Sequence, residues 1–172
     1  MVQLCDLIAP VAVVPGLKAT TKRQVLQEMA ARAARVTGQD ERALIEVLLE
    51  RERLGTTGIG GGIAIPHGKL ATIDRMYGFF ARLETPIDFD SIDNQPVDLV
   101  FMLLAPESDG TDHLKALAKI ARVLRDRSLC AKLRGSNTAE AIYAILTESA
   151  APPDADPAPV RAAPVQGRVA RR

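Results

Sequence analysis

The sequence lacks the marks of a secreted, membrane-spanning or disulfide-bonded protein. Its two cysteines, Cys5 and Cys130, are too few and too far apart for a disulfide framework, so we expect two reduced thiols. No apolar run approaches the ~20 residues that a membrane helix needs, and the N-terminus has no basic start of the kind that opens a signal peptide. These absences predict a cytoplasmic protein that does not insert into a membrane.

An excess of charge of one sign is also missing, because 22 basic residues stand against 21 acidic ones. No basic face dominates, so the charge gives no reason to expect a nucleic-acid partner. The two cysteines and two histidines are scattered, whereas structural zinc sites usually pair their ligands at short spacing. We therefore expect no metal and no other cofactor.

Proline is concentrated at the C-terminal end, where five of the 11 prolines lie after residue 150 among alanines and valines. Proline has no backbone donor and a fixed φ, so this stretch cannot continue a helix or join the middle of a sheet. A chain of 172 residues is about one domain with an extension. We expect a domain over residues 1–149 and a disordered Pro/Ala-rich extension over residues 150–172.

Before that extension, helical and strand patterns alternate. Helical patterns run from Thr21 to Gly38, from Asp40 to Gly55, from Asp112 to Leu124, and over 128–134 and 138–148. Strand patterns cover 11–14, 63–65, 76–83 and 97–104. The last two strands are apolar on both faces, which is typical of strands covered by helices on both sides. The alternation predicts an α/β fold in which helices cover both faces of a sheet.

The segment 51–69 concentrates groups that bind an anion. Its clustered glycines let the backbone turn tightly and come close to a phosphate; they are Gly58, Gly60, Gly61 and Gly62. The neighbouring Thr57 adds a hydroxyl donor. The spacing matches neither the dinucleotide-binding fingerprint nor a P-loop. The pattern therefore indicates either a phosphate-binding backbone or plain turns.

Two histidines are the candidate reactive groups. His67 follows Pro66, whose fixed φ gives a stiff approach, and Gly68 leaves space beside the ring. An imidazole is mostly neutral in the cytoplasm and is then a nucleophile. His113 lies at the start of a predicted helix, where the helix dipole disfavours an imidazolium and favours a bound anion, so a neutral ring can donate one N–H to a phosphate. An ordinary loop role for His67 and an exposed first-turn role for His113 are the alternatives.

Arg51 continues the apolar stripe of its predicted helix by one turn, so it lies where the buried face reaches the helix end. Its aliphatic stem can cover the core. Alternatively, its guanidinium can aim at the glycine segment, where a planar fork suits a phosphate. Arg53 and Lys69 are alternative cations in the same neighbourhood.

The order Thr-Gly-Ile-Gly-Gly-Gly-Ile-Ala-Ile-Pro-His-Gly-Lys, residues 57–69, resembles the active-site motif of a known family. It is similar to the fructose/mannitol-type IIA family of the bacterial sugar phosphotransferase system, and most similar to its branch of nitrogen-regulatory enzymes IIA. Further matches lie at 83–90, 93–99 and 113–118, and the resemblance covers residues 3–148. It implies a single domain with a mixed β-sheet flanked by helices on both faces.

The resemblance also implies roles for three residues. His67 corresponds to the phosphorylated histidine, Arg51 to the arginine that assists at the site, and His113 to the second histidine. The implied phosphate donor is HPr or its nitrogen-branch relative, a small carrier phosphorylated on histidine and charged from phosphoenolpyruvate. The implied targets are proteins controlled by phosphorylation state, such as transporters or sensor kinases.

The sequence therefore predicts a phosphoryl carrier and regulator that turns over no metabolite of its own. Within the family, the alternative is a sugar-specific IIA component that passes phosphate to a separate IIB protein. A hydrolase with His67 and His113 as acid and base is a second class, but neither Gly-x-Ser-x-Gly nor His-Glu-x-x-His occurs. A binding module with structural histidines is the third class.

Overall fold

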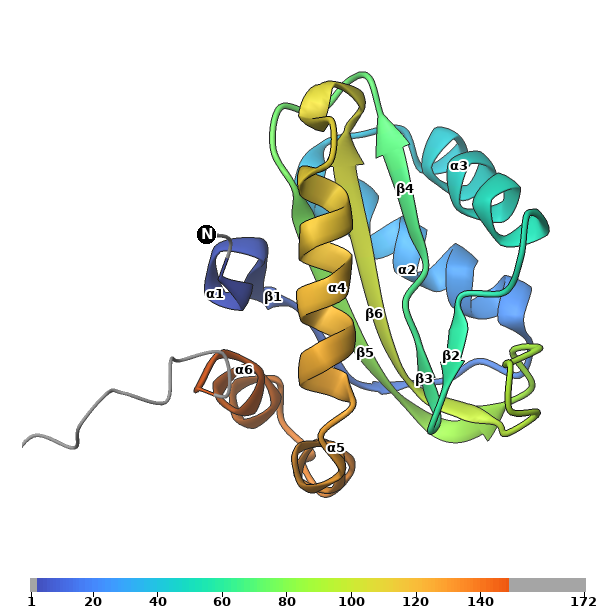
Figure 1. Cartoon of the computed structure of the whole chain (residues 1–172), viewed down its shortest axis with the longest axis vertical. Coiled ribbons are helices and arrows are strands. Elements are labelled where there is room, and N and C mark those ends of the chain that lie inside the picture. Colours follow the sequence, from blue (N-terminus) through green and yellow to red (C-terminus); the bar gives the residue numbers. More distant parts are fainter. Residues whose placement is uncertain (1–2, 149–172) are drawn as a thin grey trace, which may run out of the picture.

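A computed structural model describes residues 3–148 as a six-stranded sheet with helices on both faces (Figure 1). The strands are β1 (Ile8–Leu17), β2 (Gly58–Gly60), β3 (Ile63–Ala64), β4 (His67–Leu70), β5 (Tyr77–Ile87) and β6 (Val97–Pro106). Their order is β1-β5-β6-β3-β2, and β4 also pairs with β6. Strand β5 runs antiparallel to β6, while β3 and β4 run parallel to it, so the sheet is mixed and the predicted fold class is confirmed.

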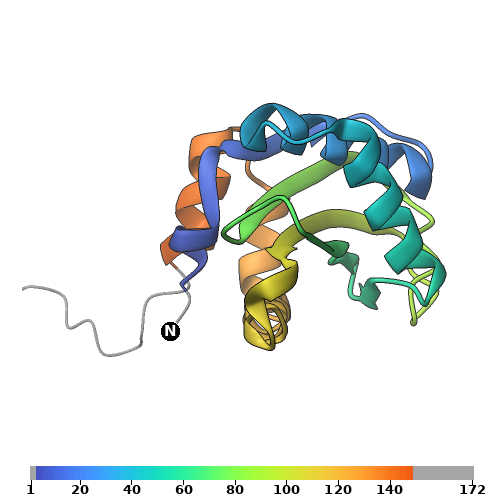
Figure 2. The ribbon, with the colours of Figure 1, turned by 90° about the horizontal axis from the view of Figure 1, so that it is seen from above.

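The helices are α1 (Leu4–Leu7), α2 (Lys22–Thr37), α3 (Glu41–Arg53), the 3-10 helix η1 (Glu107–Asp109), α4 (Asp112–Leu124), α5 (Arg127–Arg134) and α6 (Ala139–Glu148). Helix α2 lies on one face of the sheet and α4 on the other (Figure 2). Helix α3 packs beside β4, and α6 packs against β1. In this part of the chain, no helix is long and apolar enough to cross a membrane. The predicted extension over 150–172 lies outside the described residues.

Local sequence chemistry sets the ends of α2 and the start of α3. The Thr21 hydroxyl accepts a hydrogen bond from the Gln24 amide (3.1 Å) and caps α2, whose other end is closed by Gly38 in the left-handed conformation (φ 71°). The Asp40 carboxylate caps α3 by accepting from the Ala43 amide (3.4 Å). These three boundaries lie where the sequence predicts them.

The sheet contains more strand than the sequence predicts. Strand β1 is longer than 11–14, and β2 and β4 are additional strands in what the sequence indicates as a loop. The sequence of β4, His-Gly-Lys-Leu, has no strand periodicity of its own. It is extended because it pairs with β6, where His67 is opposite Leu103 and Leu70 is opposite Pro106.

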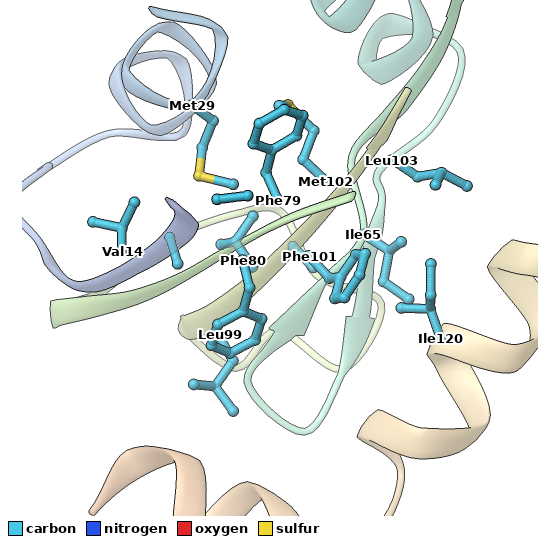
Figure 3. Close-up of a cluster of buried hydrophobic side chains, with 14 of the residues drawn as sticks. Val14, Met29, Ile65, Phe79, Phe80, Leu99, Phe101, Met102, Leu103 and Ile120 are labelled. Carbon is cyan, nitrogen blue, oxygen red and sulfur yellow. The ribbon is translucent and has the colours of Figure 1, made fainter. Parts of the chain in front are cut away.

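The core lies on both sides of β5 and β6, as their continuous apolar sequences predict. Phe80 and Phe101 are fully buried and meet edge to face with their ring centroids 6.3 Å apart. Figure 3 shows that Met102 points to the opposite side of the sheet from Phe101, toward Met29 of α2. Because both faces of β6 are buried, its position is fixed, and so is the position of any strand that pairs with it.

Candidate functional site

A cavity of about 630 Å³ opens where β4 and β6 pass between α3 and α4. Three of the predicted site residues line it: Arg51 from the last turn of α3, His67 from β4 and His113 from the first turn of α4. They come from parts of the chain up to 62 positions apart, so only the fold brings them together. The predicted convergence of these three side chains is therefore present in the structure.

The position of His67 follows from the pairing of β4 with β6. The carbonyl of Pro66 accepts a hydrogen bond from the Leu103 amide (3.0 Å), and His67 lies opposite Leu103 in the register. Since Leu103 is buried in the middle of the core, the backbone beneath the histidine is well anchored. The imidazole projects from a strand, which places it more firmly than a free loop would.

The hydrogen bonds of the His67 ring define its tautomer. Nδ1 lies 2.9 Å from the carbonyl oxygen of Ile65, which can only accept, so Nδ1 carries the proton. Nε of Arg51 donates to Nε2 at 3.1 Å, so Nε2 presents its lone pair. The neutral ring thus has its nucleophilic nitrogen in the cavity beside a guanidinium.

The surroundings of His67 favour this neutral form. Burial lowers the pKa of His67 below its ordinary value of 6.5, and the positive charges of Arg51 and His113 lower it further. The hydrogen bond to Ile65 and the charge of Glu52 act in the opposite direction but do not outweigh these causes. The imidazole is therefore neutral at neutral pH, with a free lone pair that can act as a nucleophile.

Arg51 reaches the ring because α3 lies very close to β4. Its guanidinium is held between Nε2 of His67 and the carbonyl of Gly55, to which Nη1 donates at 3.1 Å. A side chain on Gly68 would overlap Cγ1 of Val47 in α3. The space beside Gly68, which the sequence suggests is left for the ring, is filled by Val47 instead.

His113 is held by the turn that precedes α4. Its Nδ1 lies 3.0 Å from the carbonyl oxygen of Gly110, so this nitrogen also carries a proton. A neutral His113 would then have only a lone pair at Nε2. The ring can donate to a phosphate through Nε2 only when it is an imidazolium, a form that the partial positive charge of the helix start disfavours.

The glycine segment does not reach this cavity. Gly60, Gly61 and Gly62 have positive φ values of 99°, 66° and 82° because they form the turn between β2 and β3. The turn lies level with Leu99 of β6, four residues before Leu103, which is about 13 Å along a strand. Gly60 and Gly61 line a separate cavity of about 590 Å³ beside α5. Gly58, Gly60, Gly61 and Gly62 do not line the histidine cavity, so the structure gives no support to their predicted role at the site.

Thr57 is also committed elsewhere. It is buried, and its hydroxyl donates to Oε2 of Glu52 at 2.6 Å. It does not line the histidine cavity, so the predicted contact of its hydroxyl with a phosphate has no support in the structure. Arg53, one of the alternative cations, lines a different hollow between α2 and α3.

Lys69, an alternative cation predicted from the sequence, does line the cavity. The sequence did not single out Glu50, which adds charge to the wall, or Leu54 and Leu114, which add exposed apolar surface (85% and 56% exposed). Leu114 lies in the first turn of α4, on the same helix as the buried Ile120 and Leu124, but it is exposed at the cavity. Across residues 3–148, no three His, Cys, Asp or Glu side chains gather in a way that could hold a metal ion.

Comparison with known proteins identifies the family. Residues 6–149 match the family "Phosphoenolpyruvate-dependent sugar phosphotransferase system, EIIA 2", and the chain belongs to this family. A nitrogen regulatory protein of Bradyrhizobium diazoefficiens is 62% identical over 143 residues, which are 83% of this chain and 94% of that protein. The nitrogen regulatory protein of Escherichia coli is 44% identical over 135 residues, 78% and 83% of the two chains.

The solved structures agree with this assignment. The crystal structure of the nitrogen regulatory protein IIA-Ntr of Neisseria meningitidis superimposes with a TM-score of 0.80 at 33% identity, covering 84% of this chain and 99% of that one. The family and the nitrogen-regulatory branch predicted from the sequence are confirmed, and with them the role of phosphocarrier and regulator. The sugar-specific alternative is less well supported.

Proposed function

We propose that this phosphocarrier accepts a phosphoryl group on Nε2 of His67 from an HPr-type donor that is itself phosphorylated on histidine. The observation that carries the proposal is the tautomer of His67, which presents the lone pair of Nε2 to the cavity beside Arg51. His113, on the neighbouring wall, adds a group that can donate to the phosphoryl oxygens once protonated. Phosphoryl transfer depends mainly on such positioning and charge stabilisation.

The transfer step is a direct exchange of one P–N bond for another. The Nε2 lone pair attacks the phosphorus of the donor's phosphohistidine, and the electron pair of the broken bond stays with the donor's imidazole. Nδ1 of His67 keeps its proton and its bond to Ile65. The guanidinium of Arg51 leaves Nε2 as phosphorus arrives and turns to the phosphoryl oxygens, which its planar fork suits.

Regulation follows from the charge that this step adds. A phosphoryl group brings about −1.5 to −2 charge to a cavity rimmed by the exposed Leu54 and Leu114. Partners that dock on this apolar rim will distinguish the two states by electrostatics. We propose that such partners include transporters or sensor kinases, and that exchange occurs in the cytoplasm. A fold relative, mannitol enzyme IIA of Escherichia coli, was solved in complex with phosphorylated enzyme IIB.

The decisive experiment follows labelled phosphate into the chain. Purified protein is mixed with enzyme I, an HPr-type carrier and labelled phosphoenolpyruvate, and the acid-labile label on this chain is measured. The parent chain and His113→Ala should both become labelled, while His67→Ala should not. Equal labelling of His67→Ala and the parent would show that the acceptor is another residue.

A further inference from the structure

A buried glutamate lies directly beside the candidate arginine. The side chain of Glu52, next to Arg51 in α3, is only 6% exposed. Its Oε1 accepts from the Thr57 amide at 3.0 Å and lies 2.7 Å from Nζ of Lys22, while Oε2 accepts from the Thr57 hydroxyl at 2.6 Å. All of the strong contacts of this carboxylate therefore go to the start of α2 and to the chain that leaves α3.

The hydrogen bonds of Glu52 connect it, through Thr57, to both Arg51 and His67. On one side, the carboxylate ties Thr57 back to the end of α3, where the Gly55 carbonyl receives Nη1 of Arg51. On the other side, the Thr57 carbonyl accepts from the Ile65 amide at 2.9 Å, and the Ile65 carbonyl accepts from Nδ1 of His67 at 2.9 Å. The contact between Arg51 and His67 closes the ring of hydrogen bonds.

We propose that Glu52 is a positioning residue for phosphoryl transfer, which acts through Thr57 to fix the tautomer of His67 and the place of Arg51. The inference rests on the function proposed above. Glu52 does not touch the reacting atoms, because its carboxylate faces Lys22 and Thr57 on the other side of the loop. It acts by holding the two segments that carry the guanidinium and the imidazole at one separation.

A purely structural role explains the arrangement less well. Burying a carboxylate costs free energy, and an ion pair often stabilises a fold no more than apolar side chains of the same volume would. A carboxylate that accepts two hydrogen bonds also fixes the orientation of Thr57, because both the amide and the hydroxyl of this residue must point at Glu52. The negative charge also acts on the ring at a distance, because Glu52 raises the pKa of His67 against the other causes that lower it.

The test compares Glu52→Gln and Thr57→Val with the parent. The first removes the charge and one acceptor, and the second removes only the hydroxyl at nearly constant volume. Thr57→Ser keeps the hydroxyl and serves as the rescue, and Glu46→Gln, at an exposed position of α3, is the matched control. Three quantities are measured: the melting temperature, the rate of phosphoryl transfer at saturating donor, and the ¹⁵N shifts of the His67 ring, which report the tautomer.

At a temperature where every variant is folded, Glu52→Gln should slow transfer about tenfold, within the roughly 100-fold cost of a misplacement of about 1 Å. Thr57→Val should show a smaller loss in the same direction. Both should raise the fraction of His67 that carries its proton on Nε2, while Thr57→Ser and Glu46→Gln behave as the parent. If Glu52→Gln is too unstable to assay, Thr57→Val alone decides.

A fall in melting temperature with an unchanged tautomer and transfer rate would assign Glu52 to stability only and overturn the inference. Failure of the proposed function is seen separately, because the parent would then take no label from the donor or His67→Ala would take as much. The positioning role fails when the parent is labelled at His67 and the variants are labelled just as fast.

Discussion

The two ends of β6 carry cavities of similar size but of different chemistry. At the end that leads to α4, about 630 Å³ is lined by Arg51, His67 and His113. At the other end, about 590 Å³ is lined by the glycine turn, Arg134 and other residues of α5. Both cavities contain arginine, and the glycine turn is only five residues from His67 in sequence.

The difference lies in what the arginine faces. Arg134 forms a bidentate pair with Asp98, at 2.8 and 2.9 Å, and donates to the Gly61 carbonyl, so its charge is already compensated. The pKa of Arg134 is raised, mainly by that hydrogen-bonded carboxylate. Within the described part of the chain, Arg51 has no such ion pair and faces a neutral ring. An uncompensated cation beside a lone pair, and not the volume or the glycines, distinguishes the end that carries the proposed acceptor.

Removing the guanidinium should break this distinction most strongly among the changes that leave His67 in place. We expect Arg51→Ala to slow transfer by about 100-fold, the scale of losing one preorganised donor. Arg51→Lys keeps the charge but not the fork, so its loss should be smaller. Single-turnover transfer from a phosphorylated carrier measures both. Arg134→Lys, in the other cavity, is the control, and a defect there as large as that of Arg51→Ala would contradict the comparison.

Removing His113 should have a smaller effect on transfer and a clear effect on the product. His113→Ala leaves Nε2 of His67 intact, so the chain should still accept phosphate, but the phosphohistidine should hydrolyse several times faster. The lifetime of the label after removal of the donor measures this. His113→Gln, whose amide can donate from nearly the same place, should restore part of the lifetime, and equal lifetimes in all three proteins would exclude the contact.

A pH titration of His67 measures how strongly its surroundings in the cavity lower its pKa. Because burial and nearby cations lower the pKa of His67, the neutral ring should persist below pH 6.5 in an NMR titration. Below pH 6.5 the unfolded chain binds a proton on this histidine that the folded protein does not bind. The contribution of His67 to the free energy of unfolding is therefore fully present above pH 6.5 and is lost as the pH falls through the lower pKa of the folded state. Arg51→Ala removes one cause of the lowering, so the midpoint should move upward; a downward shift would contradict this.

Changes in the glycine turn should leave transfer untouched. A side chain at Gly62 would overlap the Arg134 guanidinium and lie 2.9 Å from the Asp98 carboxylate, at a φ of 82°. We expect Gly62→Ala to cost on the order of 1–3 kcal/mol of unfolding free energy. Gly61→Ala has the same sign of φ but open space around it, so it should cost less. Denaturant unfolding measures the difference, and equal costs would show that backbone strain alone is responsible.

Some features of the fold were predictable because their causes are local. Thr21, Gly38 and Asp40 mark helix ends through their own side chains or backbone, and the apolar runs of β5 and β6 required cover on both faces. Strand β4 was not predictable in this way, since its four residues become a strand only by pairing with β6.

The features of the candidate site likewise separate into those that the sequence predicted and those that depend on the folded structure. The order of residues around His67 and His113 predicted the family, and the resemblance placed Arg51 at the site. The position of Arg51 on the face of its helix left open whether it covers the core or faces the glycine segment. The glycines were ambiguous, because positive φ serves a hairpin turn as well as an anion-binding loop. The tautomer of His67 depends on where the Ile65 carbonyl points, which no spacing in the sequence reveals.

Gly68 has a consequence for how this site can evolve. It reacts with nothing, yet Val47 fills the place where its side chain would be, and this contact sets how near α3 comes to β4. Catalytic side chains can be replaced by single substitutions, each exposed to selection on its own. Gly68 can be enlarged only after Val47 has become smaller, so these two positions constrain each other's mutational paths.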